Sequence, residues 1–155
     1  MGLAGHSMGG QAAAIAAGSP CAEGYGIKAV ALHHPASGKV PEGNVGENIT
    51  VPLISFSSHG DRLCPAKFAE GIMTAAKSPV KAYRKSWHYT HLEPLLIWPI
   101  CNPLLAKMTA AWFKVFLNDE TGGYWKDLIF GDKPESLCKS MSMVECYRKL
   151  NERKF

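Results

Sequence analysis

The sequence lacks several patterns by which whole classes of protein are recognised. It has no apolar run of about 18 residues, which excludes a membrane-spanning helix, and it has no internal repeat, low-complexity tract or long linker. Its five cysteines form no C-x-x-C pair, and its histidines form no H-E-x-x-H motif. Neither a zinc site nor a thioredoxin-type site is therefore predicted, and no metal or organic cofactor is expected.

The basic residues also lack the arrangement typical of nucleic-acid binding. The 17 Lys and Arg residues against 13 Asp and Glu residues give a formal net charge of +4. Part of this excess lies in the last nine residues, "YRKLNERKF". We interpret residues 141–155 as a basic C-terminal tail that forms a solvated surface helix or a frayed end. No basic stripe interleaved with aromatic residues occurs elsewhere, so nucleic acid is not an expected partner.

What the sequence does contain is the alternation of strands and helices typical of an α/β fold. With 155 residues, 46% of them apolar, the chain can bury the core of one domain. Segments 27–32, 51–58 and 80–87 are predicted strands, and segments 8–17 and 66–77 are predicted helices. The strand at 80–87 is more polar than the others, which favours a place nearer the sheet edge. We predict a parallel sheet with flanking crossover helices.

The clearest predicted helix begins after residue 102. Asn102 is a favoured N-cap residue, and Pro103 suits the first helical position. Apolar residues then recur at helical spacing, namely Leu104, Leu105, Met108, Trp112, Val115 and Phe116. This apolar stripe predicts a helix that packs against the sheet.

The first ten residues, "MGLAGHSMGG", carry the strongest chemical signal. Residues Gly5 to Gly9 match the pattern G-x-S-x-G, and a helix-forming run follows directly. The pattern is typical of a sharp strand-to-helix turn that strains the serine backbone and exposes its side chain as a nucleophile. We expect glycine on both sides of Ser7 because neighbouring backbone passes very close. The alternative is a glycine-rich turn that binds phosphate.

A serine nucleophile needs a base, and the base needs an orienting carboxylate. Asp61 is the only aspartate between Ser7 and His91, and it follows the predicted strand 51–58. Catalytic loops gather at that end of a parallel strand, although a plain turn-forming role for Asp61 stays open. Two histidines compete as the base. We favour His91 and expect His88 to have a structural or substrate-lining role.

The five cysteines are an odd number, and their pairing is open from the sequence. Cys138 and Cys146 lie close together, and Cys101 follows a proline-containing turn. One disulfide among these three is expected in an oxidising compartment, and buried free thiols are the alternative. The cellular location is unknown from the sequence, with a secreted or lumenal setting favoured.

Four segments together resemble the C-terminal half of a serine α/β-hydrolase. They are "GHSMGG" with its alanine-rich helix, "VPLISFSSHGDRLCP", "KAYRKSWHYTHLEP" and "AAWFKVFLNDET". Within that superfamily they are most similar to cutinase-like polyester hydrolases and dienelactone-hydrolase-like esterases. The resemblance implies a partial α/β-hydrolase fold in residues 1–140. It also implies that the N-terminal strands, and the loop supplying a second oxyanion donor, lie upstream of the given sequence.

The resemblance also implies a role for individual residues. Ser7 corresponds to the nucleophile, Asp61 to the orienting acid and His91 to the general base, while the Met8 backbone N–H corresponds to an oxyanion-hole donor. The loop "HHPASG" corresponds to a segment that lines the substrate cleft, and it contains His33, His34 and Pro35. It lacks the aromatic residue that polyester hydrolases carry nearby. The C-terminal disulfide of that family has a counterpart in Cys138 and Cys146.

The expected function is therefore a serine carboxylic-ester hydrolase that works through an acyl-enzyme. Its expected substrates are small or polymeric esters, lipid-like or resembling cutin or polyester. Other acyl chemistry on the same triad, namely that of an acyltransferase, thioesterase or peptidase, is an alternative, because fold and triad do not fix the substrate. A non-catalytic hydrolase-like fragment is the second alternative.

Overall fold

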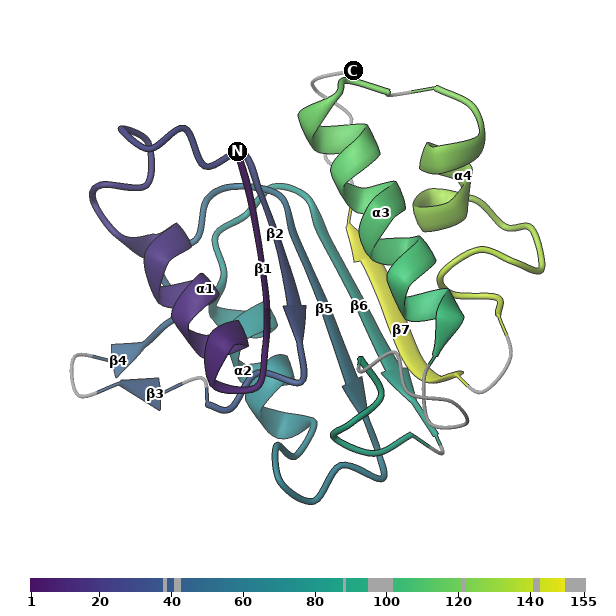
Figure 1. Cartoon of the computed structure of the whole chain (residues 1–155), viewed down its shortest axis with the longest axis horizontal. Coiled ribbons are helices and arrows are strands. Elements are labelled where there is room, and N and C mark those ends of the chain that lie inside the picture. Colours follow the sequence, from purple (N-terminus) through teal and green to yellow (C-terminus); the bar gives the residue numbers. More distant parts are fainter. Residues whose placement is uncertain are drawn as a thin grey trace.

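A five-stranded, mostly parallel sheet organises the protein (Figure 1). The computed structural model describes residues 1–37, 39–40, 43–87, 89–94, 102–120, 122–140 and 143–149. The strands lie in the order β1 (Gly2–His6), β2 (Ala29–His33), β5 (Leu53–Ser58), β6 (Lys81–Ser86) and β7 (Met143–Lys149). The first four run parallel, and β7 pairs antiparallel with β6. A separate short hairpin pairs β3 (Lys39–Val40) with β4 (Gly43–Asn44).

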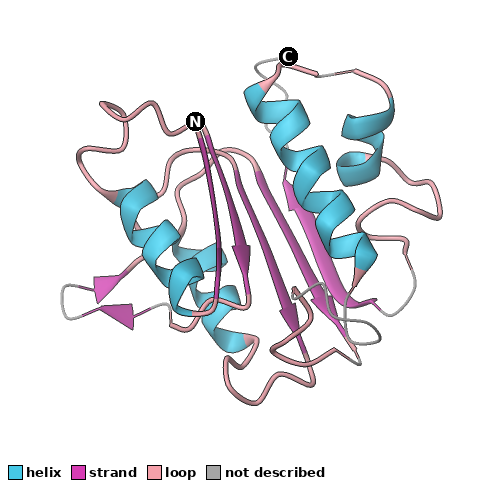
Figure 2. Cartoon of the chain, in the orientation of Figure 1, coloured by secondary structure: helices cyan, strands magenta, loops and turns pink. Residues whose placement is uncertain are grey.

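Helices cover both faces of this sheet (Figure 2). The first face is covered by α1 (Met8–Gly18) and α2 (Lys67–Ala75), and the opposite face by α3 (Pro103–Leu117) and α4 (Tyr124–Phe130). Strands alternating with helices, and a mainly parallel sheet, make this an α/β protein. The predicted class is thus confirmed. Among the described residues, no helix is both long enough and apolar enough to span a membrane.

Strand β2 is apolar over its first four residues because both of its faces are buried. On β2, Val30 and Leu32 join the core beneath α1 and α2, whereas Ala29 and Ala31 join the core beneath α3 and α4. All four side chains are fully buried. An uninterrupted apolar run is the expected signature of such a strand.

Helix α3 begins where its capping residues predict. The Asn102 side-chain oxygen accepts a hydrogen bond from the backbone N–H of Leu104 at 3.1 Å, and Pro103 is the first helical residue. The apolar stripe of the helix packs on the sheet, with Trp112 fully buried and its ring centroid 4.5 Å from that of Phe116.

The C-terminal stretch differs from its sequence-based expectation. Residues 143–149 are neither a surface helix nor a frayed end, because they form β7 along the side of β6. Among the described strands, β6 is therefore the second from the edge of the sheet, and polar residues of β6 have partners. Lys85 pairs with Glu145 of β7 at 2.7 Å and with Glu70 of α2 at 2.8 Å. Residues 150–155 lie outside the described residues.

A disulfide joins Cys138 to Cys146, with the two Cα atoms 5.4 Å apart. This confirms the expected pairing and ties β7 to the segment that follows α4. Cys21 is an exposed free thiol and Cys64 a buried one, while Cys101 lies outside the described residues.

Removing this disulfide should weaken the attachment of β7. Replacing Cys138 and Cys146 together by serine should lower the free energy of unfolding by about 2 kcal/mol, because the unfolded chain gains freedom. Urea denaturation under non-reducing conditions measures the change. Replacing the exposed Cys21 by serine is the matched control and should leave the midpoint unchanged. Equal stability of the wild type and the double variant would contradict this account.

Candidate active site

Ser7 occupies a strained turn between β1 and α1. Its backbone dihedrals are φ 58° and ψ −123°, a conformation that non-glycine residues rarely adopt. Backbone hydrogen bonds hold it, from the Ser7 N–H to the carbonyl of His33 at 3.0 Å, and from the N–H groups of Ala36 and Gln11 to the carbonyl of Ser7 at 3.0 and 3.1 Å. Met8 begins α1, where first-turn N–H groups have no partner within the helix and can therefore stabilise an anion.

The glycines around Ser7 are not equally required. A Cβ atom on Gly5 would lie 2.1 Å from the carbonyl oxygen of Gly9, and one on Gly10 would lie 3.0 Å from that of Gly5. A Cβ atom on Gly9 would meet no atom within 4 Å. The prediction that neighbouring backbone leaves no room for a side chain is therefore confirmed at Gly5 and wrong at Gly9. The close approach falls one residue later, at Gly10.

Asp61 lies just beyond β5 and is saturated with hydrogen bonds. Its Oδ1 accepts from the backbone N–H groups of Leu63 and Cys64, at 2.9 and 2.8 Å. Its Oδ2 accepts from Nδ1 of His91 at 2.8 Å and from Nδ1 of His34 at 2.7 Å. Burial alone would raise the pKa of Asp61, but these hydrogen bonds outweigh it and hold that pKa well below its usual range.

His91 is brought to Asp61 as its predicted role requires. Because Nδ1 faces the carboxylate, the other ring nitrogen, Nε2, is directed away from Asp61. The ring nitrogen Nε2 of His6 donates to the backbone carbonyl of His91 at 2.7 Å, and the two rings have centroids 4.5 Å apart. His6 thus fixes the loop that carries His91. The competing histidine, His88, lies outside the described residues.

Cys64 completes the immediate surroundings of Ser7. Its sulfur lies 3.9 Å from the hydroxyl oxygen of Ser7 and 4.0 Å from Nε2 of His91. Among the described residues, the Ser7 hydroxyl contacts this sulfur rather than His91. Burial raises the pKa of the Cys64 thiol, so the sulfur stays protonated at neutral pH. No sequence pattern pointed to Cys64 beyond its place three residues after Asp61.

The three residues expected to line a substrate cleft, His33, His34 and Pro35, have different environments. His34 is fully buried, and carboxylates contact both of its ring nitrogens, so it has no surface for a substrate. Pro35 is also buried and packs near Gly10 at the start of α1. Only His33 faces a cavity.

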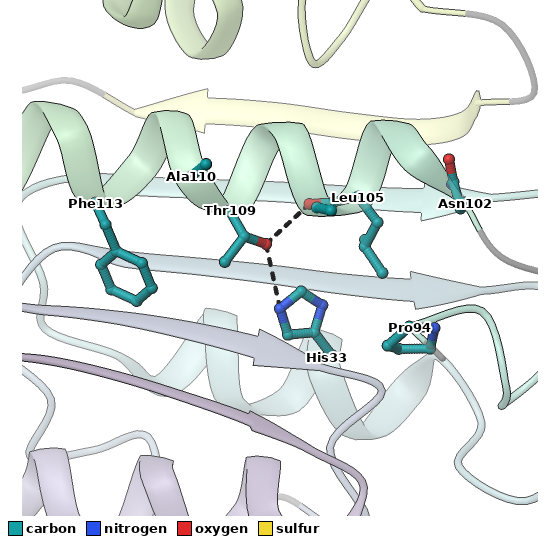
Figure 3. A pocket seen from close by; sticks show the side chains of 8 residues that line it. His33, Pro94, Asn102, Leu105, Thr109, Ala110 and Phe113 are labelled. Atoms are coloured by element: carbon teal, nitrogen blue, oxygen red, sulfur yellow. Dashed lines mark hydrogen bonds between the residues drawn. The ribbon is translucent and has the colours of Figure 1, made fainter. Parts of the chain in front are cut away.

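This cavity, of about 430 Å³, lies between the sheet and α3 (Figure 3). Its lining is mainly apolar and includes Pro94, Leu105, Ala110 and Phe113. The Thr109 hydroxyl donates to the Leu105 carbonyl at 2.9 Å, so it accepts from Nε2 of His33 at 3.2 Å. Burial lowers the pKa of His33 to about 4, which makes its ring neutral at neutral pH. His33, which lines the cavity, is next to Ser7 in space, because its carbonyl accepts a hydrogen bond from the Ser7 N–H.

Glu93 is a further site residue that sequence reasoning missed. It is buried, and its Oε2 accepts from Nε2 of His34 at 2.9 Å. Its Oε1 accepts from the hydroxyl of Ser86 at 3.3 Å and from the side-chain amide of Asn102. The signal was its position two residues after His91, although acidic residues in loops are usually solvated.

His34, Asp61 and His91 are also the residue types that bind metals. One candidate ligand atom from each lies within 4.8 Å of the others. Here, however, the contacting nitrogens and oxygen are 2.7 and 2.8 Å apart. A tetrahedral zinc ion with bonds of about 2.0–2.1 Å would hold its ligand atoms roughly 3.3 Å apart. The observed spacing is that of hydrogen bonds.

Comparison with known proteins adds no relative. No known family model matches the chain, and no curated protein matches its sequence.

The unequal glycines allow a matched test of the turn. Gly5→Ala should lower the free energy of unfolding by about 2 kcal/mol or more, because the added Cβ overlaps the Gly9 carbonyl. Gly9→Ala should raise it by up to about 1 kcal/mol, because alanine favours the helix and meets open space. Chemical denaturation of both variants checks the pair. A destabilised Gly9→Ala, or an undisturbed Gly5→Ala, would refute the described turn.

Proposed function

We propose that this chain carries the catalytic residues of a serine carboxylic-ester hydrolase with the α/β-hydrolase arrangement. The observation that carries the proposal is the 2.8 Å hydrogen bond from Nδ1 of His91 to Asp61, at the end of the sheet where Ser7 projects from a strained turn. The three residues follow three parallel strands of the sheet, β1, β5 and β6, in the order serine, acid, histidine, which is the α/β-hydrolase order. Their hydrogen bonding matches the roles of base and orienting acid.

In the proposed reaction, Ser7 attacks the ester carbonyl and His91 takes the proton from its hydroxyl. The Met8 N–H stabilises the resulting oxyanion. His91 then gives this proton to the leaving alcohol as the C–O bond breaks, which leaves an acyl-serine. A water molecule then gives a proton to His91 and attacks the acyl carbon. The bond from that carbon to the Ser7 oxygen breaks as His91 returns the proton to this oxygen, which releases the acid. The first step requires the Ser7 hydroxyl to turn from the Cys64 sulfur toward Nε2 of His91.

The protonated state of Cys64 supports Ser7 as the nucleophile. A thiol whose pKa is raised supplies little thiolate at neutral pH, whereas a serine hydroxyl is activated by an adjacent base. Asp61 remains ionised throughout the neutral range, because its pKa lies below its usual value. It can therefore stabilise the imidazolium that forms on His91.

The surroundings of the site favour an apolar ester as the substrate. Large apolar side chains next to the triad residues are exposed, with Met8 at 76%, Leu63 at 73% and Leu92 at 43% of their full accessible area. The cavity beside His33 is also lined mainly by apolar groups. A lipid-like or polyester-like substrate would bury this surface, and each CH2 group so buried contributes about 0.8 kcal/mol.

Labelling with a fluorophosphonate probe tests the assignment of the nucleophile. The probe should label Ser7, as located by mass spectrometry, and Ser7→Ala should abolish labelling. Asp61→Asn should slow it on the order of a thousandfold, because His91 loses its orienting anion. Cys64→Ala should still be labelled at Ser7. A wild type that is not labelled would favour the non-catalytic alternative, and an acyl-enzyme that prefers alcohols to water would favour a transferase.

The cavity beside His33 can be tested as the acyl-chain pocket. Ala110 lines it, and Ala110→Trp should fill much of its volume. The ratio of kcat/KM for p-nitrophenyl octanoate to that for the acetate should fall at least about tenfold, or about 1.4 kcal/mol. Ala16→Trp is the control, since Ala16 is an exposed helical alanine of α1, outside the cavity lining. An unchanged ratio in Ala110→Trp would place the acyl chain elsewhere.

A further inference from the structure

Asp61 is shared by two imidazoles, and the Ser–His–Asp reaction uses only one of them. The second belongs to His34, whose side chain has no exposed area. Nδ1 of His34 lies 2.7 Å from Asp61, and Nε2 lies 2.9 Å from Glu93. A neutral imidazole has a single N–H group and could satisfy only one of these carboxylates. An imidazolium has two N–H groups and satisfies both.

The side chain of Glu93 accepts hydrogen bonds from two further residues, Ser86 and Asn102, which fix its carboxylate beside His34. The hydroxyl of Ser86, the last residue of β6, donates to it at 3.3 Å. The side chain of Asn102 also donates to it, and the backbone N–H of Asn102 donates to the Glu93 carbonyl at 3.3 Å. Asn102 caps α3, so one residue both starts that helix and orients the carboxylate.

The backbone of His34 is also unusual. Its φ of 45° lies in the left-handed region, as does that of Ser7 at 58°. Histidine enters this region more often than most residues, but the conformation is still unfavourable and persists only where the surroundings impose it. It occurs immediately after β2, where the chain turns and His34 meets Asp61. One member of the proposed triad, Ser7, and the residue that contacts its acid, His34, therefore both have a strained backbone.

We propose that His34 and Glu93 extend the triad inward, with His34 acting as a buried imidazolium that keeps Asp61 ionised and aimed at His91. This inference rests on the proposed function. His34 is a positioning residue in it, because its effect on the reaction passes through Asp61. Glu93 in turn stabilises the positive charge of His34 and fixes the orientation of its ring.

The charges of the four hydrogen-bonded groups explain why this helps. With Asp61 and Glu93 ionised and His34 protonated, the group carries one net negative charge. When His91 accepts the Ser7 proton, the group becomes neutral, which suits a buried site. Without the imidazolium, two buried carboxylates would have no cation between them, and one of them would take up a proton.

The other titratable groups around His34 are compatible with this charge. His6 and His91 have ring centroids 6.2 and 5.9 Å from that of His34, and His33 precedes it in the chain. Burial lowers the pKa of His6 and of His33, so neither adds a positive charge at neutral pH. The buried guanidinium of Arg84 interacts electrostatically with the carboxylate of Glu93. Burial alone would lower the pKa of His34, but its hydrogen bonds to Asp61 and Glu93 raise it.

The test compares His34→Gln, Glu93→Gln and the double variant by their rates of Ser7 labelling from pH 5 to 9. His34→Gln should label at least about tenfold more slowly at pH 7 than the wild type. The fall of its labelling rate at acidic pH should occur about one pH unit higher, or more, because Asp61 now keeps its proton to a higher pH. The double variant also lacks the negative charge of Glu93. Its fall in labelling rate should therefore move back toward lower pH, and its labelling rate at pH 7 should partly recover.

His59→Gln is the matched control, because His59 is an exposed histidine near the same end of the sheet, where it stacks on Trp87. It should behave as the wild type. An unchanged pH profile in His34→Gln would overturn the inference. The inference would also be overturned if His34→Gln lost the same fraction of its labelling rate at every pH and the double variant showed no recovery. His34 would then have only a packing role. Failure of the wild type to label Ser7 would overturn the proposed function instead.

Nitrogen NMR of the histidine rings decides the charge on His34 without any activity measurement. Both ring nitrogens of His34 should be protonated at pH 8 in the wild type. In Glu93→Gln, one of these protons should be lost at a lower pH than in the wild type. A single protonated nitrogen in the wild type at pH 7 would overturn the inference, even if His34→Gln does not fold.

Discussion

The arrangement of the site depends on the carboxylate of Asp61. One of its oxygens is held by two backbone N–H groups of its own loop, and the other receives an N–H from His34 and one from His91. These contacts join the segments that follow β2, β5 and β6, which are distant in sequence and adjacent in the sheet. Because every lone-pair direction is occupied, the carboxylate cannot rotate without breaking several hydrogen bonds. That rigidity is what preorganisation requires.

The part of the site that the sequence could predict is the part set by local patterns. Ser7 was identifiable as a candidate nucleophile because the G-x-S-x-G pattern extends over five consecutive residues. Asp61 was identifiable because it is the only aspartate in the interval, and His91 because it follows the next strand along the chain. The cap at Asn102 likewise predicted the start of α3 correctly. In each case, a few neighbouring residues carry the information.

The rest depended on contacts between distant residues. His34 was expected at a substrate cleft, but its left-handed backbone turns the ring inward, and no sequence pattern encodes that turn. Glu93 and Cys64 acquire their roles only when the loops after β5 and β6 meet. Residues 143–149 show no apolar alternation typical of a strand. Their strand conformation comes from pairing with β6, which precedes them by about 60 residues.

Strand β7 has a further consequence for how the molecule meets others. It lies on the outer side of β6 in the described sheet, and it carries charged side chains that include Glu145, Arg148 and Lys149. Arg148 reaches Asp132 at 3.2 Å, so part of this charge is anchored. A sheet border that bears charge and is covalently pinned is a poor template for the strands of another molecule. The stretch that reads as a basic tail therefore discourages self-association along this border.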